Sequence, residues 1–376
     1  MPNCIERSFR ETALLNGLSK RIAPDARVVV ICVARIGDTL LSTPVLQAIK
    51  DACPDGELTC LAHPKRLEIL QGLSCIDRLA GITKKIALWQ GRLGAKRWDY
   101  ALVYGRDDAL DNYALRAANC VVGFARSDRK RAAHPFHVSV APPENIAHAV
   151  DERLLLAEAL GIQARSKRLR YQISDPEIAA ADRWIRHRIG SDGKRLIGLQ
   201  FASFPTKAYR DWPTDSIIAL GRRILDRYDD VMLLCLGGPA DAQKGKAVAA
   251  ALGRRCESIA GELSLRESSA VMARLSLYIG VDTGPTHVAG ALGTPMVVLY
   301  HCRHRGRHLM PLEHPAPIVV IEHPQSDEGC STETPMSDIS VEAVWADVQR
   351  TLENLCRPSK SATLRTDHGR APTLST

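Results

Sequence analysis

Aromatic side chains are scarce in this sequence, in which Phe, Trp and Tyr make up 5% of 376 residues. Their scarcity disfavours a protein that binds nucleic acid by stacking bases on aromatic rings. The sequence also has no run of 18 apolar residues, which excludes a membrane-spanning helix of the usual length. Its first 26 residues carry scattered charges and no continuous apolar segment, so we expect no secretory signal. The composition, 45% hydrophobic and 24% charged, is typical of a globular chain, and the length suits two domains.

Cysteines are present, but their spacing is not that of a metal site. No two of the eleven cysteines are separated by only two residues, as in zinc sites and redox dithiols. Cys32 and Cys235 lie within apolar segments, where a thiol acts as a small apolar side chain. An odd number of cysteines without a secretory signal indicates reduced thiols. The sequence therefore predicts a cytoplasmic protein whose cysteines are free.

Acidic residues are too few to balance the basic ones. The chain has 42 Asp and Glu against 50 Lys and Arg, which gives a net charge of +8. Such a surplus indicates an anionic partner: a phosphorylated ligand, a nucleic acid or an acidic lipid surface. Because the sequence has no nucleic-acid recognition motif, we expect no nucleic-acid partner.

Apolar runs of strand length alternate with helical patterns along the chain. Residues 27–34 form a continuous apolar run, typical of a strand covered on both faces in a parallel sheet. A helical pattern follows at once, and the alternation restarts at residues 196–201. This pattern predicts an α/β fold with two Rossmann-like, doubly wound domains that face a central cleft. We place these domains at residues 1–165 and 166–340, a helix at 341–355 that packs back towards the N-terminal domain, and a disordered tail at 356–376.

The loop after the first strand carries a carboxylate at the start of a helix. It contains a single glycine, Gly37, and lacks the G-x-G-x-x-G pattern of a dinucleotide site, which disfavours a dehydrogenase. Asp38 in this loop has two interpretations. It caps the free amides of the helix, or it points into the cleft as a general base.

The second half has a stronger pattern for anion binding, Asp282-Thr283-Gly284-Pro285-Thr286-His287. Gly284 permits a tight turn after a strand, and Pro285 suits the first position of a helix. The free amides of that helix, with the two threonine hydroxyls and His287, would form a cradle for a diphosphate. Asp282 would accept a hydrogen bond from a sugar hydroxyl. The alternative is an ordinary helix start with a buried histidine.

Three further loops at strand ends carry polar side chains. Lys207 and Arg210 are cations placed either for phosphate contact or on the surface. Asp241 either binds a ribose or caps a helix. The loop at residues 301–308 has three histidines and a cysteine, but the spacing matches no zinc pattern and the interleaved arginines would repel a cation.

Four blocks of this sequence, in this order, resemble glycosyltransferase family 9, the ADP-heptose:lipopolysaccharide heptosyltransferases. They are Arg35-Ile36-Gly37-Asp38-Thr39-Leu40 with Pro44, the cationic loop that ends in Trp212-Pro213, the turn from Asp282 to His287 with Ala289 and Ala291, and the segment near Met336 to Ile339. The resemblance implies a GT-B fold, with the acceptor on the N-terminal domain and the nucleotide-sugar on the C-terminal one. It also implies an inverting transfer that uses neither a metal nor a cofactor.

The resemblance further implies roles for individual residues. Asp38 matches the family's general base, and the donor-binding residues would be Lys207, Arg210, Asp241, Leu263, Asp282, Thr283, Gly284, Thr286 and His287. Acceptor-side candidates are Arg35, Gly37, Thr39, Arg126, Arg129, Lys130 and Arg131. The implied partners are an ADP-sugar donor and an anionic lipid-linked glycan, with peripheral contact to the cytoplasmic face of the inner membrane. The last four cations would meet the phosphates of that acceptor or the membrane.

Two loops depart from the pattern of the family. Residues 301–308 stand where the family has a phosphate-binding threonine motif, and Phe201-Ala202-Ser203 stands where it has proline-glycine. Both loops flank the donor, so the donor sugar and base stay open. The alternatives are a transferase of this fold with another acceptor, such as a protein or another surface glycan, or with another nucleotide-sugar, and a nucleotide-sugar-binding protein without catalysis.

Overall fold

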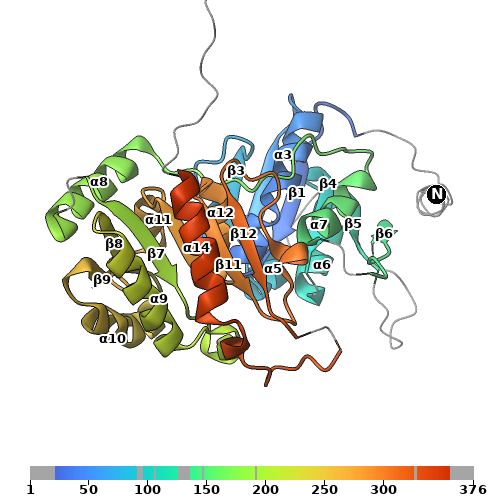
Figure 1. Cartoon of the computed structure of the whole chain (residues 1–376). Helices are drawn as coiled ribbons and strands as arrows, with labels where there is room; N and C mark the ends of the chain where they lie inside the picture. The colour runs from blue at the N-terminus through green and yellow to red at the C-terminus, as the bar shows by residue number, and fades with distance from the viewer. Residues whose placement is uncertain are drawn as a thin grey trace, which may run out of the picture.

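The computed structural model describes residues 22–90, 96–105, 107–125, 136–145, 148–190, 193–325 and 328–355. Its strands form two six-stranded parallel sheets, which occupy opposite halves of the molecule in Figure 1. The N-terminal sheet has the order β3-β2-β1-β4-β5-β6. Its strands are β1 (Val28–Cys32), β2 (Leu58–Ala62), β3 (Arg78–Gly81), β4 (Trp98–Tyr104), β5 (Ala118–Phe124) and β6 (Val138–Val140).

The C-terminal sheet repeats this topology. Its order, β9-β8-β7-β10-β11-β12, places the first strand of the unit between the second and the fourth, as in the first sheet. The strands are β7 (Arg195–Gln200), β8 (Val231–Cys235), β9 (Cys256–Ser258), β10 (Leu277–Val281), β11 (Met296–Tyr300) and β12 (Ile318–Glu322). This is the order of doubly wound Rossmann sheets, so the predicted fold class is confirmed.

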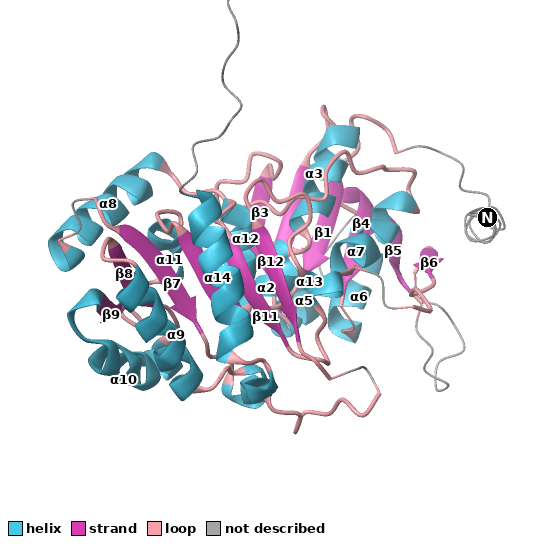
Figure 2. Ribbon diagram, in the orientation of Figure 1, coloured by secondary structure: helices cyan, strands magenta, loops and turns pink. Residues whose placement is uncertain are grey.

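Helices cover the sheets, as Figure 2 shows. Strands β1, β8 and β11 are buried along their whole length, which explains their continuous apolar runs. Helix α9 buries Ile217, Leu220 and Ile224, the spacing of one helical face. The α-helices are α2 (Ile36–Leu40), α3 (Thr43–Ala52), α4 (Leu67–Leu70), α5 (Lys84–Gln90), α6 (Asp108–Ala117), α7 (Ala149–Glu158), α8 (Asp175–Ile189), α9 (Thr214–Arg227), α10 (Ala242–Leu252), α11 (Leu265–Met272), α12 (Gly284–Leu292), α13 (Gly306–Leu309) and α14 (Val341–Leu355).

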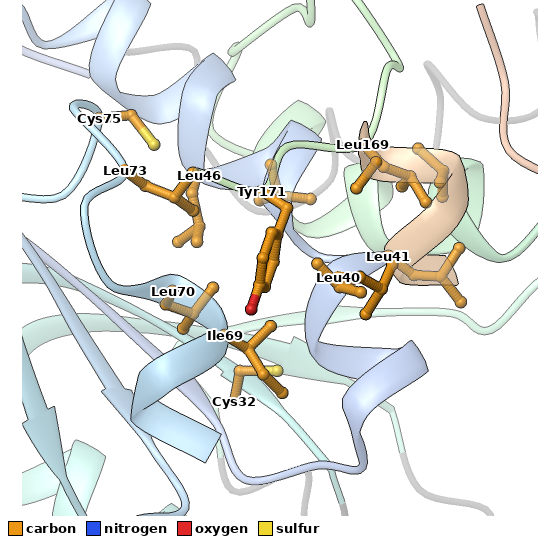
Figure 3. Close-up of a cluster of buried hydrophobic side chains, with 14 of the residues drawn as sticks. Cys32, Leu40, Leu41, Leu46, Ile69, Leu70, Leu73, Cys75, Leu169 and Tyr171 are labelled. Atoms are coloured by element: carbon orange, nitrogen blue, oxygen red, sulfur yellow. The ribbon is translucent and has the colours of Figure 1, made fainter. Parts of the chain in front are cut away.

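A single apolar core joins the two halves. Leu40 and Ile69 of the N-terminal half belong to the same buried cluster as Met272 and Val288 of the C-terminal half. Tyr171, in the segment that connects the halves, lies among Leu40, Ile69 and their neighbours (Figure 3). The contact between the domains is therefore a continuous apolar layer, together with polar contacts at its rim.

The packing of α14 corrects one expectation. We expected the helix at 341–355 to pack back towards the N-terminal domain. Its buried side chains Val344, Val348 and Leu352 lie instead in the core of the second sheet, and α14 packs against α9. The expectation is wrong because the apolar face of α14 completes the cover of the sheet that immediately precedes it in the chain.

One disulfide bond corrects the expectation of free thiols. Cys302 and Cys330 are bonded to each other, 28 residues apart in the sequence. Cys302 follows β11 and Cys330 lies in the loop after β12; because these parallel strands are neighbours, their loops meet at one edge of the sheet. Among the described residues, no helix combines the length and the apolar character needed to cross a bilayer.

Candidate active site

The candidate residues follow the strands that flank the switch point of each sheet. In a Rossmann sheet this point lies between the first and the fourth strand, where ligands bind at the carboxyl ends. Asp38 follows β1, the first strand of the N-terminal sheet. Lys207 and Arg210 follow β7, and the turn from Asp282 follows β10, so both sides of the second switch point carry candidate groups.

Asp38 is an exposed carboxylate bound by a largely buried arginine, Arg153. The position that precedes α2 is Arg35, so Asp38 does not cap the helix, and that interpretation is wrong. The Asp38 side chain is 51% exposed, and its Oδ1 accepts a hydrogen bond of 2.8 Å from Arg153 Nη2. The carboxylate is thus open to solvent on one side and fixed on the other, as a group that takes a proton from a substrate requires.

Arg153 was not singled out from the sequence. It lies on α7, with its side chain 16% exposed, and donates also to Ser42 Oγ (3.2 Å) and to the Ala149 carbonyl (2.9 Å). These three acceptors fix the guanidinium, which in turn fixes Asp38. The two residues are 115 positions apart in the sequence, and no local pattern indicates their contact.

Asp282, Arg210 and His287 form a buried polar cluster at the start of α12. Arg210 Nη1 donates to Asp282 Oδ2 at 2.6 Å and to the Asp282 carbonyl at 3.2 Å. His287 Nε2 lies 3.6 Å from the other carboxylate oxygen. Burial alone would raise the pKa of Asp282, but the neighbouring His287 and the charge of Arg210 lower it below its usual value. Asp282 is therefore an anion in the interior, and Arg210 is its partner.

The turn after β10 leaves the first amides of α12 without a side-chain cap. Thr283 occupies the capping position, and its hydroxyl donates to the Val281 carbonyl at 3.3 Å instead of accepting from the helix. Thr286 is fully buried, and its hydroxyl donates to the same carbonyl at 2.5 Å. The expectation that the Thr286 hydroxyl binds a diphosphate is therefore wrong: it closes the turn from within.

Helices α2 and α12 meet directly, which joins the two candidate sites. An ideal Cβ at Gly37 would lie 2.6 Å from Cδ2 of His287, and one at Gly284 would lie 3.0 Å from Cβ of Ile36. Arg35 also spans the two halves, with its guanidinium carbon 5.7 Å from the ring centre of Phe204. The loop that carries Asp38 thus contacts the donor turn.

Thr39 is not a surface residue of the acceptor side. Its side chain is buried, and its hydroxyl donates to the Arg35 carbonyl at 2.8 Å. The acceptor-side expectation for Thr39 is wrong because the side chain is on the buried side of α2 and bonds to that helix's own backbone. Arg126, Arg129, Lys130 and Arg131 lie outside the described residues.

One aromatic ring, that of Tyr209, lies close to both cations after β7. Lys207 Nζ and the Arg210 guanidinium carbon each lie 5.7 Å from the ring centre of Tyr209. The Tyr209 hydroxyl lies 2.8 Å from Nε2 of His304, whose pKa is lowered to about 4 by burial and by the nearby Arg210 charge. His304 is therefore neutral at pH 7, and Lys207 and Arg210 carry the positive charge here.

His301, Cys302 and Cys330 place three potential metal-ligating atoms within 4.8 Å of one another. The two sulfur atoms are bonded to each other, so in this oxidised form they are not thiolate ligands. His301 accepts from the Arg303 amide through Nδ1 at 3.2 Å, and its Nε2 lies 3.0 Å from the Thr334 carbonyl. The cluster as described is a disulfide with a hydrogen-bonded histidine.

Asp241 and Leu263 lie in the loops after β8 and β9. Asp241 Oδ2 accepts from the Gly238 amide at 3.0 Å, and burial raises the pKa of this carboxyl group. The side chain thus holds the Gly237-Gly238 turn. Leu263 is partly buried against the shared apolar core. Both loops end at the same edge of the sheet as the donor turn.

Comparison with known proteins identifies a family and several structures that are similar to this chain. The family model described as "Glycosyltransferase family 9 (heptosyltransferase)" matches residues 92–336. The lipopolysaccharide core heptosyltransferase OpsX of Haemophilus influenzae is 22% identical over 283 residues, which cover 72% of this chain and 78% of that protein. The crystal structure of a family 9 glycosyltransferase from Veillonella parvula superposes with a TM-score of 0.75 at 21% identity, over 89% of this chain and 99% of that one. Escherichia coli heptosyltransferase WaaC with ADP gives a TM-score of 0.64 at 17% identity, over 86% and 99%.

Two Rossmann-like domains, superposable on these structures, define a GT-B fold. Because the family model covers well over half of the sequence, the chain belongs to glycosyltransferase family 9. The family expected from the sequence is confirmed.

Proposed function

We propose that this enzyme transfers a heptose from ADP-heptose to an anionic, lipid-linked acceptor of the lipopolysaccharide core, with inversion at the anomeric carbon. The family match and the core heptosyltransferase of Haemophilus influenzae support the heptose and the acceptor class. The WaaC structure with ADP supports the nucleotide. Cytoplasmic location and peripheral contact with the inner membrane belong to the same proposal.

Asp38 is the proposed general base. Inversion in one displacement needs one carboxylate that takes the proton from the acceptor hydroxyl as its oxygen bonds to the anomeric carbon. Asp38 is exposed, lies at the carboxyl end of β1 and is held by Arg153 on the side away from solvent. It can therefore accept a proton from a sugar hydroxyl without moving its backbone.

The donor diphosphate is assigned to the first turn of α12 and the cations after β7. As the glycosidic bond to ADP breaks, negative charge develops on the β-phosphate. Uncapped amides at a helix N-terminus stabilise such charge, and Lys207 and Arg210 add positive charge. We assign leaving-group stabilisation to these protein groups, so the proposed reaction needs no metal ion.

The observation that best supports this proposal is the direct contact between α2 and α12, because it brings the segment with Asp38, the proposed base, against the turn proposed to bind the donor diphosphate. The test is ADP release from ADP-heptose, with and without a Kdo–lipid A acceptor. We compare the wild type, Asp38→Asn, and Asp229→Asn, which removes an exposed carboxylate of the far domain surface.

Acceptor-dependent release that collapses in Asp38→Asn but persists in Asp229→Asn would support the transferase and its base. Release that survives in Asp38→Asn would remove Asp38 from this role. Thermal stabilisation by ADP-heptose without release, for any offered acceptor, would favour the nucleotide-sugar-binding alternative. Neither release nor stabilisation would overturn the donor assignment and favour another nucleotide-sugar.

A further inference from the structure

Helix α5 presents an apolar face that no described part of the chain covers. The helix follows β3, packs against α6 and is tied to the loop after β4 by an ion pair between Lys84 and Asp107. Figure 2 shows α5 beside α6 in the N-terminal half. Ala87 faces the core of this half, whereas the next two side chains face away from it.

Those two side chains are Leu88 and Trp89, which are 59% and 76% exposed. Among the described residues they are the two most exposed of the large hydrophobic side chains, and they are neighbours on one short helix. Single exposed hydrophobic residues are common, but a tryptophan and a leucine exposed together mark an interaction site.

The segment of the chain that carries this pair has charges of one sign. From Arg78 to Trp98 the sequence contains no aspartate or glutamate. The described cations in this stretch are exposed, and Lys85, Lys96 and Arg97 make no ion pair with another described residue. Lys85 precedes Leu88 and Trp89 by one helical turn, so the cation and the apolar pair share one side of α5. Asp77 and Asp99 flank this stretch, but they pair with Lys50 and Arg27, and Asp107 pairs with Lys84 at the start of α5.

We propose that Lys85, Leu88 and Trp89, with Lys96 and Arg97, form a docking surface for an anionic lipid bilayer. Tryptophan and leucine enter the headgroup region with their apolar parts, and lysine and arginine stay at the charged headgroups. Each cation close to an anionic leaflet adds to the attraction. Lys85, Lys96 and Arg97, which pair with no described acidic side chain, complement a lipid surface that is negative throughout, and this argument selects a bilayer over a protein partner.

The position of α5 fits a lipid-linked acceptor. The helix begins three residues after β3, at the carboxyl edge of the sheet where β1 ends before Asp38. Lys96 and Arg97 precede β4, which is parallel to β1, so they lie at the opposite, amino edge. Docking through α5 and these cations would therefore set the flank of the acceptor half that joins the two edges towards the bilayer. This link to the acceptor rests on the proposed function, whereas the binding of the bilayer itself does not.

Co-sedimentation with vesicles tests the surface. The full chain is mixed with vesicles of phosphatidylcholine alone, or of phosphatidylcholine with phosphatidylglycerol. We expect binding to the anionic vesicles, weakened about tenfold by Trp89→Ser and by Lys85→Glu. Leu355→Ser and Lys246→Glu, which change an exposed leucine and an exposed lysine of the C-terminal half, should bind like the wild type.

Three outcomes would overturn the proposal. They are equal binding to both vesicle types, unchanged binding of the two α5 variants, and loss of binding in the control variants to the same degree. A fourth is self-association of the wild type that Trp89→Ser abolishes while vesicle binding persists, because the face would then bind a second copy of the chain. Sedimentation velocity without vesicles measures this.

Measurements of ADP release with two forms of the acceptor distinguish a failure of the docking surface from a failure of the proposed function. With a deacylated, water-soluble acceptor, Trp89→Ser and Lys85→Glu should release ADP at the wild-type rate. With the acceptor in vesicles, their rates should fall about as much as their vesicle binding. If the wild type releases no ADP with either acceptor, the proposed function is wrong. The co-sedimentation experiment then still tests the docking surface, because it does not depend on activity.

Discussion

The imidazole of His287 lies against the Cα of Gly37, so closely that a Cβ at position 37 would lie 2.6 Å from the ring. These residues come from different halves of the molecule, 250 positions apart in the sequence. The glycine is required here by this close approach and not by an unusual backbone conformation. The contact couples the position of the Asp38 loop to the Asp282 cluster.

Gly37→Ala should therefore damage catalysis more than stability. The added methyl group must displace His287 or separate α2 from α12, at a cost of about 1–3 kcal/mol. We expect a fall in kcat of at least about tenfold. Gly238→Ala, where an added Cβ meets nothing within 4 Å, is the control for thermal stability. A Gly37→Ala enzyme with wild-type kcat would show that the two helices need not touch during turnover.

Arg153 should act as a positioning residue for Asp38. Arg153→Lys keeps the charge but loses the planar fork that binds Asp38, Ser42 and Ala149 together. We expect kcat to fall about tenfold in Arg153→Lys and further in Arg153→Met, with little change in the KM of the donor. Steady-state ADP release measures this, with Arg183→Lys on the exposed side of α8 as control. A change confined to the donor KM would contradict the assignment.

Removal of Arg210 should leave a buried anion without its partner. The Asp282 side chain is 4% exposed and accepts its shortest hydrogen bond from Arg210. Arg210→Met should lower the free energy of unfolding by about 3 kcal/mol. The double variant Arg210→Met with Asp282→Asn should recover part of this loss, because the unpaired charge is then absent. Urea denaturation of the four proteins tests the coupling; additive effects would contradict it.

Glu177 should make stability depend on pH in the acid range. Hydrogen bonds from Arg266 hold its pKa at about 2, below the usual 4.5. Because the unfolded chain binds this proton at a higher pH, the stabilisation is complete above about pH 5 and is lost as the pH falls towards 2. Glu177→Gln should have a lower Tm than the wild type at pH 7, and the difference should shrink below pH 5. Glu333→Gln, at an exposed carboxyl group, should show no such trend.

The bond between Cys302 and Cys330 should stabilise the C-terminal half. It closes a loop of 28 residues, which corresponds to about 3–4 kcal/mol of lost entropy in the unfolded chain. Dithiothreitol should lower the Tm of the wild type, and Cys330→Ser should have the lower Tm without the reductant. Thiol titration in denaturant should find two more groups after reduction than before. An equal thiol count would contradict the bond.

The parallel sheets were predictable because their strands are continuous apolar runs. Strands β1, β8 and β11 have no polar face, and such runs occur where helices cover both sides. The turn from Asp282 was recognisable for a local reason as well, since Gly284 and Pro285 mark the start of a helix after a strand. Helix α8 was not anticipated, because it buries only Ala181 and Ile185 and so lacks an apolar stripe.

The contacts that complete the site were not predictable from local pattern. Arg153 reaches Asp38, and Cys302 reaches Cys330, only because the sheets bring distant loops to one edge. The direction in which the Thr39 and Thr286 hydroxyls point was also not predictable from the sequence. Thr39 and Thr286 follow residues that are exposed or half-buried, Asp38 and Pro285, but helical geometry turns both hydroxyls onto backbone carbonyls of their own turns. A sequence shows which residues share a loop, not which side of it they face.

The apolar layer shared by the two halves has a consequence for synthesis. Leu40 and Ile69 leave the ribosome long before Met272 and Val288, which cover them in the finished protein. At the usual rate of translation, the N-terminal half waits roughly ten seconds or more with this surface exposed. The nascent chain therefore passes through a stage in which this apolar surface is exposed to water and is prone to aggregate until the second half covers it.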